Sequence, residues 1–182
     1  MDFTEQLLPS SGYTTILVII DCLSNEGIFI PTANTATAID IAEAFVTHVF
    51  AKHGILLHVL SDHGSKFTSH FFQSLGSLLR MRLHFTSGHH PPANGQVECI
   101  NSTLEQYICI YCNYQQDNWS KLLPLAEFAY NNAPHAMMGI SPFFTTCRYD
   151  PLITVYSDAE ITNLHVCHFA VNFDKMHKFL HD

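Results

Sequence analysis

The sequence predicts an α/β fold in which helices flank a mixed β-sheet. Short apolar runs separated by turn residues open the chain, as in the strands of an antiparallel meander. Helical and strand periodicities then alternate, which is typical of layered α/β proteins and requires part of the sheet to be parallel. With 182 residues, 47% of them hydrophobic, the chain is long enough for one domain with a packed core.

Three strands are expected in the meander, at residues 1–7, 14–21 and 28–31. The second, TTILVIID, is a continuous run of apolar and β-branched residues, so it is expected to be a central strand. Turn-forming Pro, Ser and Gly residues separate the three runs.

A helix is expected to begin at Thr37, because Thr37 and Asp40 have the spacing of a capping box, and to end at His53 before Gly54. The elements expected after it are a strand at 57–61, a helix at 69–79, a strand at 82–85, a loop at 86–96, and helices at 96–115 and 119–132. The five strands would form one mixed sheet. Residues 157–182 are expected to form an amphipathic, helical tail, which leaves residues 1–156 as the core domain.

The composition limits the functional classes. Eight Lys and Arg residues face sixteen Asp and Glu residues, a formal net charge of −8, and the composition alone argues against a stand-alone DNA-binding protein. No apolar run is long enough to span a membrane, and the first residues lack the basic region of a signal peptide. The six cysteines follow no secreted disulfide framework, so a reducing compartment is expected.

Three acidic residues stand where metal chemistry is feasible. Asp62 ends a predicted strand, Glu98 lies near the start of the long helix with 35 residues between them, and Asp2 lies in the first strand. Convergent carboxylates are suitable ligands for divalent ions that assist phosphoryl displacement. Acidic residues are also common at strand ends and in first helical turns, so the spacing alone leaves a purely structural interpretation open.

Longer motifs surround these acids. The segment SDHGSKFTSHFF around Asp62 resembles the SDRGSxFTSxFW segment of gypsy-type LTR retrotransposon and spumaretroviral integrases. HHPPANGQVECIN around Glu98 is similar to their YHPQTDGQTERxN, and the segment TLEQYICIYCNYQQDNWSKLLPLAEFAYNNAPHAMMGISPF resembles a third block of that family. The resemblance covers residues 1–156 in order.

This resemblance implies a ribonuclease-H-like catalytic core with a triad of metal-binding acids. Asp62 and Glu98 match the second and third acids. The first is expected to be Asp2, because MDFTEQLLPSSGY matches the family segment that carries it, whereas Asp21 matches a turn acid and is interpreted as structural. The family has more residues before this Asp, so the first strand is expected to be truncated.

By analogy, two Mg²⁺ (or Mn²⁺) ions held by Asp2, Asp62 and Glu98 would support 3′-end processing and strand transfer on DNA. Lys66, Asn94 and Gln96 are candidate nucleic-acid contacts; a solvated lysine and two loop-forming residues are the simpler interpretations. The resemblance also implies binding of nucleic acid (DNA, with RNA as a further ligand), homo-oligomers, no membrane association and action in the nucleus.

Several basic positions of the family are lost. His63, Cys22, Cys99 and Cys109 stand where arginine or another basic residue is common, and each change from Arg to Cys or His needs one C-to-T-type substitution. The sequence therefore suggests a mutationally decayed copy. No His₂Cys₂ module precedes the core and no chromodomain follows it in this chain, so complete integration by this chain alone is not expected. A non-catalytic relic or co-opted interaction domain is the alternative.

Two other site chemistries stay open. His84 and His89, together with Cys109 and Cys112, have the composition of a His₂Cys₂ zinc site, although the two cysteines fall inside the long helix. A nucleophilic cysteine is the second option, with Cys99 as its candidate.

Overall fold

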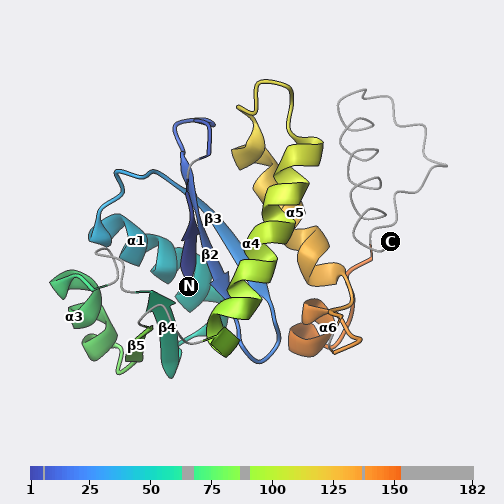
Figure 1. Ribbon diagram of the computed structural model, residues 1–182. Helices are drawn as coiled ribbons and strands as arrows, with labels where there is room; N and C mark the ends of the chain where they lie inside the picture. Colours follow the sequence, from blue (N-terminus) through green and yellow to red (C-terminus); the bar gives the residue numbers. More distant parts are fainter. Residues whose placement is uncertain (6, 63–67, 87–90, 137, 153–182) are drawn as a thin grey trace. The chain divides into compact units, whose positions relative to one another are not determined.

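The computed structural model (Figure 1) describes the chain except for residues 6, 63–67, 87–90, 137 and 153–182. The expected tail at 157–182 therefore lies outside the described residues. Two compact units can be distinguished, and each is described by itself. The first comprises Met1–Ile20 and Ile28–Leu123, and the second comprises Asp21–Gly27 and the chain from Pro124 onward.

A three-stranded sheet forms the centre of the first unit. Its order is β1 (Asp2–Thr4), β2 (Thr15–Ile20) and β3 (Gly27–Thr32), and β1 pairs antiparallel with β2 so that Asp2 lies opposite Val18. Residues 15–18 of β2 are all at most 1% exposed, so this strand is buried on both faces. The predicted meander with a central second strand is therefore confirmed.

The first helical segment begins where the capping-box spacing predicts. Thr37 is the N-cap: its hydroxyl accepts a hydrogen bond from the Asp40 amide, and the Asp40 carboxylate accepts one from the Thr37 amide at 2.7 Å. The segment runs through α1 (Ala38–Phe45), a π-helical turn η1 (Val46–Phe50) and α2 (Ala51–His53). It ends before Gly54, which has a φ of +75° that favours glycine.

A parallel strand pair completes the first unit. β4 (His58–Asp62) and β5 (Arg82–Thr86) are joined through helix α3 (His70–Leu78). The single five-stranded sheet is not confirmed, because the described strands form one sheet of three and one of two. The two sheets are linked where the Met1 amine donates a hydrogen bond to the Leu60 carbonyl at 2.7 Å.

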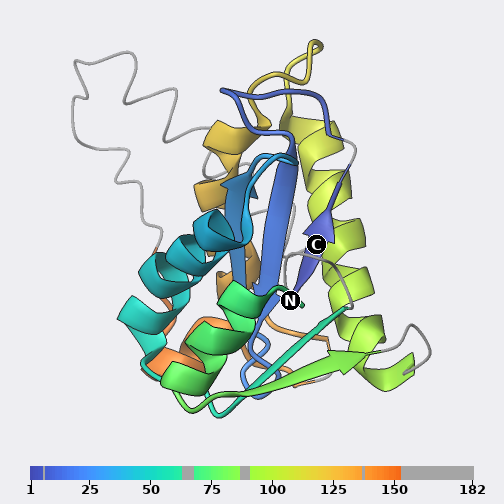
Figure 2. The same cartoon turned by 90° about the vertical axis from the view of Figure 1, so that its left-hand side faces the viewer.

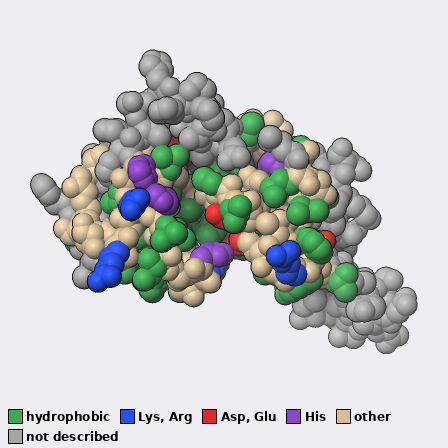
Figure 3. Space-filling view, turned by 90° about the horizontal axis from the view of Figure 1, so that it is seen from below, with side chains coloured by type: hydrophobic (Ala, Val, Ile, Leu, Met, Phe, Trp, Pro, Cys, Tyr) green, Lys and Arg blue, Asp and Glu red, His purple; other side chains and the backbone are tan. Residues whose placement is uncertain are grey.

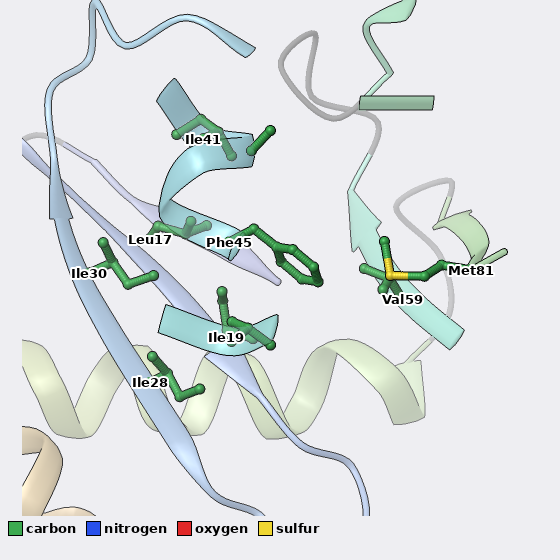
Figure 4. Packing of buried hydrophobic residues seen from close by; sticks show 10 residues of the cluster. Leu17, Ile19, Ile28, Ile30, Ile41, Phe45, Val59 and Met81 are labelled. Carbon is green, nitrogen blue, oxygen red and sulfur yellow. The ribbon is translucent and has the colours of Figure 1, made fainter. Parts of the chain in front are cut away.

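Both sheets share one apolar core (Figure 4). The side chain of Phe45 in α1 lies between the β2 residues and the pair Val59 and Met81. Phe45 is 1% exposed, so it joins the three-stranded sheet, the helix and the β4–β5 pair into one packed cluster. The remaining buried members are Leu17, Ile19, Ile28, Ile30, Ile41, Ala42 and Val49.

Helix α4 (Pro91–Tyr111) packs against the other face of β2, so α1 and α4 lie on opposite sides of the sheet (Figure 2). The sequence prediction of a loop at 86–96 is wrong from residue 91 onward. Pro91 and Pro92 occupy first-turn positions, where a missing N–H costs nothing and the fixed φ suits a helix. The helix was predicted to end at residue 115, four residues beyond the observed end of α4 at Tyr111. There the Asn113 side chain bonds Asp117, competing with helical backbone bonds.

Helix α5 (Trp119–Asn132) has the predicted bounds. At its start the Trp119 indole donates to the Leu8 carbonyl at 2.7 Å, which explains how so large a side chain is only 1% exposed. Helix α6 (Pro142–Cys147) was not predicted, although Ser141 is its N-cap and Pro142 its first residue. A Ser-Pro pair is a sequence signal for such a start.

The second unit is organised around Asn131, which is 2% exposed. Its Nδ2 donates to the Gly27 carbonyl and its Oδ1 accepts from the Gly27 amide, both at 2.8 Å. The rings of Phe128 and Phe143 pack with centroids 5.4 Å apart. One side chain thus satisfies both backbone polar groups of a residue 104 positions earlier.

Candidate active site

Asp2 lies in β1, and its carboxylate faces helix α4. The Asn101 side chain donates from Nδ2 to Oδ2 of Asp2 at 3.0 Å. Both residues are half-buried, so this hydrogen bond to a charged acceptor is only partly screened by water. The bond joins positions 99 residues apart and fixes the orientation of the Asp2 carboxylate.

Glu98 lies on α4 three residues before Asn101. Residues three apart share one side of a helix, and they are separated by about 4.5 Å along its axis. The backbone of Glu98 therefore lies on the side of α4 that carries the Asp2 contact. The side chain of Glu98 lies outside the described part of the structure.

Asp62 is the last residue of β4, where it pairs with Thr86 of β5. Met1 is the neighbour of Asp2, and its amine bonds the carbonyl of Leu60 in β4. Leu60 lies two residues before Asp62. Two residues of a strand span about 6.6 Å. The backbones of Asp2 and Asp62 thus lie in one region of the first unit, while the Asp62 side chain lies outside the described part.

Asp21 has a different role. Its carboxylate accepts hydrogen bonds from the Ser24 amide at 3.0 Å and the Ser24 hydroxyl at 2.6 Å. These local bonds close the turn between β2 and β3, as an acidic residue at the first position of a turn commonly does. The structure therefore agrees with the interpretation of Asp21 as a turn residue.

The three candidate nucleic-acid contacts are placed unequally. Lys66 lies outside the described residues. Asn94 and Gln96 were expected in a loop, and their backbones lie in the first turns of α4 instead, because the helix begins at Pro91. Their side chains lie outside the described part.

Asn101 is the site residue that sequence reasoning missed. It stands three positions after Glu98 in VECIN, so its helical spacing to a candidate ligand was visible in the sequence. The candidate ligands were chosen among charged residues, and Asn101 carries a neutral amide. Its Oδ1 atom is buried and has no hydrogen-bond partner among the described residues.

The zinc alternative finds no support in the described part of the chain, where no three His, Cys, Asp or Glu residues come together to hold a metal. Cys109 is exposed and Cys112 half-buried on α4, His84 lies on β5, and His89 lies outside the described residues. Burial raises the pKa of the Cys112 thiol, with smaller contributions from Cys109 and Asp117. Fewer Cys112 thiolates are therefore present at neutral pH than for an ordinary cysteine.

Positively charged side chains are sparse on the face drawn in Figure 3, where the Lys and Arg side chains of described residues are few and scattered. This agrees with the net charge of −8. Separately, none of the helices in the described ranges has the length and hydropathy needed to cross a bilayer.

The fold is that of retroviral integrase catalytic cores. The chain superposes on the catalytic core domain of BIV integrase with a TM-score of 0.61 and 19% identity, covering 81% of this chain and 93% of that one. For the HTLV-2 integrase catalytic core domain in complex with magnesium, the TM-score is 0.62 at 16% identity, covering 78% and 91%. A simian T-cell lymphotropic virus intasome gives 0.63 at 18% identity, covering 79% and 52%.

The sequence is similar to transposon polyproteins. The chain is homologous to the Tf2-3 and Tf2-4 transposon polyproteins of Schizosaccharomyces pombe, with 29% identity over 154 residues. The match covers 85% of this chain and 12% of each polyprotein, so the chain spans about one eighth of those relatives. No protein-family model matches the chain. The resemblance to retrotransposon and retroviral-type integrase cores is therefore confirmed.

Proposed function

We propose that this chain is the catalytic core of a retrotransposon integrase, which processes DNA 3′ ends and transfers them to target DNA by metal-dependent phosphoryl transfer. The observation that carries the proposal is the Asp2–Asn101 hydrogen bond. It ties a half-buried carboxylate to the helix that bears Glu98, beside the strand that ends in Asp62. This arrangement supports a site to which Asp2, Asp62 and Glu98 each contribute a carboxylate.

The donor set suits Mg²⁺ or Mn²⁺. Asp2, Asp62 and Glu98 would hold the ions through carboxylate oxygens, which are the hard ligands that these cations prefer. The buried Oδ1 of Asn101, without a hydrogen-bond partner among the described residues, is a further hard donor beside Asp2, able to act directly or through water. When bound, two such ions supply charge stabilisation to the attacking and leaving oxygens of an in-line displacement.

The protein side chains would do the positioning. Asn101 holds the Asp2 carboxylate in one orientation, which lowers the entropy lost when that group becomes a ligand. We propose that Lys66, Asn94 and Gln96 contact the DNA backbone, the latter two from the first turns of α4, where the helix dipole favours phosphate. We also propose action in the nucleus and assembly of more than one copy on DNA.

The test is strand transfer on labelled oligonucleotides with Mg²⁺ or Mn²⁺. Asp62→Asn and Glu98→Gln should each lower activity by about 100-fold or more, because each removes one charged ligand. Glu105→Gln is the matched control, since Glu105 is an exposed acid on the same helix, and it should retain activity. Equal activity in all three variants would contradict the assigned site.

A second candidate function rests on the charge. With eight Lys and Arg residues against sixteen acids, the copy has few phosphate contacts to offer, as expected for a decayed, non-catalytic relic or co-opted domain. A folded chain without strand transfer in either metal would favour this candidate. DNA binding should then become stronger in a chain that combines His63→Arg, Cys99→Arg and Cys109→Arg. If its affinity for DNA does not rise, loss of arginines does not explain the decay.

A further inference from the structure

Two exposed histidines meet on the parallel pair of strands β4 and β5, which are labelled in Figure 1. Nδ1 of His58 lies 3.1 Å from Nε2 of His84, and the rings stack with centroids 5.3 Å apart and 28° between their planes. In the register of the pair, His58 lies opposite Arg82 and His84 lies opposite Leu60. The two rings thus meet diagonally across neighbouring strands.

The strand pleat explains why the pair faces solvent. Val59 and Leu83, which alternate with the histidines, pack against the apolar core. Side chains of successive strand residues point to opposite faces, so His58 and His84 share the outer face. Because the opposite face is anchored in the core, the backbone positions of the two histidines are fixed by the register of the strands.

The spacing of the two nitrogens suits a shared transition-metal ion. Zinc–nitrogen bonds of about 2.0–2.1 Å put two ligand nitrogens about 2.9 Å apart at a right angle and about 3.4 Å apart at the tetrahedral angle. The observed 3.1 Å lies between these values. A hydrogen bond between neutral rings uses one N–H and one lone pair, so one tautomer exchange frees both lone pairs, and a rotation of the exposed rings would direct them at one ion.

We propose that His58 and His84 form a two-histidine site for a divalent transition metal of the Zn²⁺, Ni²⁺ or Cu²⁺ class, with water completing the coordination. Imidazole nitrogens select these ions, whereas the carboxylate set of the candidate active site selects Mg²⁺ or Mn²⁺. His58 lies four residues before Asp62 on β4, and His84 lies opposite Leu60, two residues before Asp62. These separations correspond to about 7–13 Å along the strand. The site is therefore separate from the triad and does not rest on the proposed integrase activity.

The role that follows is a clamp on two strands. An ion bound to both rings would join β4 to β5 near the ends that carry Asp62 and Thr86. Binding to the folded form alone stabilises that form by mass action. Arg82 lies opposite His58 and opposes a bound cation, but its side chain is exposed, so water and salt screen its charge.

The test uses the full 182-residue chain without a histidine tag, titrated with ZnCl₂ and NiCl₂ by calorimetry in a non-coordinating buffer. Two ligands held in one geometry bind as a chelate, so His58→Gln and His84→Gln should each weaken the strongest site by about 100-fold. His53→Gln is the matched control, because His53 is exposed on the neighbouring helix, and it should leave the affinity unchanged. Asp62→Asn should also leave it unchanged.

Ring nitrogen NMR of the unmutated protein provides a readout that needs no variant. Zn²⁺ should shift the signals of Nδ1 of His58 and Nε2 of His84 together, at one equivalent of metal. The proposal is overturned if either pair variant binds as tightly as the parent, if His53→Gln weakens binding equally, or if the two ring signals stay in place. Loss of Zn²⁺ binding in Asp62→Asn would overturn the separation from the candidate active site.

Discussion

Replacing Asn101 with alanine removes the hydrogen bond that orients the Asp2 carboxylate. Hydrogen bonds to charged groups contribute about 1.5–3 kcal/mol, and the half-buried setting of this 3.0 Å bond favours the lower part of that range. If this energy holds the carboxylate in its metal-binding orientation, about 1.5–2 kcal/mol corresponds to a loss of about 10- to 30-fold in metal affinity. Variants that disturb groups supporting a metal ligand commonly cost a similar factor.

The assay is Mn²⁺ binding by calorimetry, which reports on the site even in a copy without catalytic activity. Gln106→Ala is the control, because Gln106 is an exposed amide on the same helix. Its side chain bonds Ser102, one helical turn earlier. Thermal unfolding of both variants separates positioning from stability. If Asn101→Ala and the parent chain bind Mn²⁺ equally well, Asn101 does not position a ligand and the site reasoning fails.

Three further predictions concern stability. Asn131→Ala removes both hydrogen bonds to Gly27 and leaves two buried backbone groups unsatisfied, so the free energy of unfolding should fall by about 2–4 kcal/mol in urea titrations. Gly76→Ala should destabilise the chain although alanine favours helices, because an added Cβ would lie 2.8 Å from the Leu83 side chain. Asp40→Ala should lower the melting temperature above pH 3.8, because its bonds to Thr37 lower the Asp40 pKa below that ordinary value. The difference from the parent should shrink as the pH falls through the folded-state pKa.

Each of these has an outcome that contradicts it. Unchanged hydrogen exchange of the Gly27 amide in Asn131→Ala would show that another group satisfies it. A higher melting temperature for Gly76→Ala would mean that Leu83 moves aside freely; in a Leu83→Ala background the same change should stabilise, which is the control. For Asp40→Ala, a melting-temperature difference that grows toward acid pH would have the opposite sign to the one expected.

Local rules predicted those parts of the fold that local chemistry determines. The Thr37–Asp40 capping box, the helix end before Gly54 and the bounds of α5 depend on residues a few positions apart, and all three are found. The start of α4 was missed because the two prolines and two glycines of residues 86–96 were assigned to a loop. At Pro91, the proline ring instead occupies a first-turn position that suits it.

Local rules do not predict contacts between residues that are far apart in the sequence. The Asp2–Asn101 bond joins residues 99 positions apart, and the His58–His84 pair depends on the register of two parallel strands. The spacing in the sequence places Asn101 near Glu98 on one helix, but it does not indicate the contact of Asn101 with Asp2 or the contact of His58 with His84. Asp2 was predicted from the family resemblance, whereas its neutral partner Asn101 can be identified only from the fold.

The two-sided burial of β2 has a consequence for the candidate site. Because the strand is apolar on both faces, a slip by one position would exchange one apolar set for another, so hydrophobicity hardly selects its alignment with β1. The Ser10–Tyr13 bridge lies in the connection between β1 and β2, so it restricts which residues of the two strands can pair. The connection between β1 and β2 thus helps to set whether the acid at position 2 points toward Asn101 or away from it.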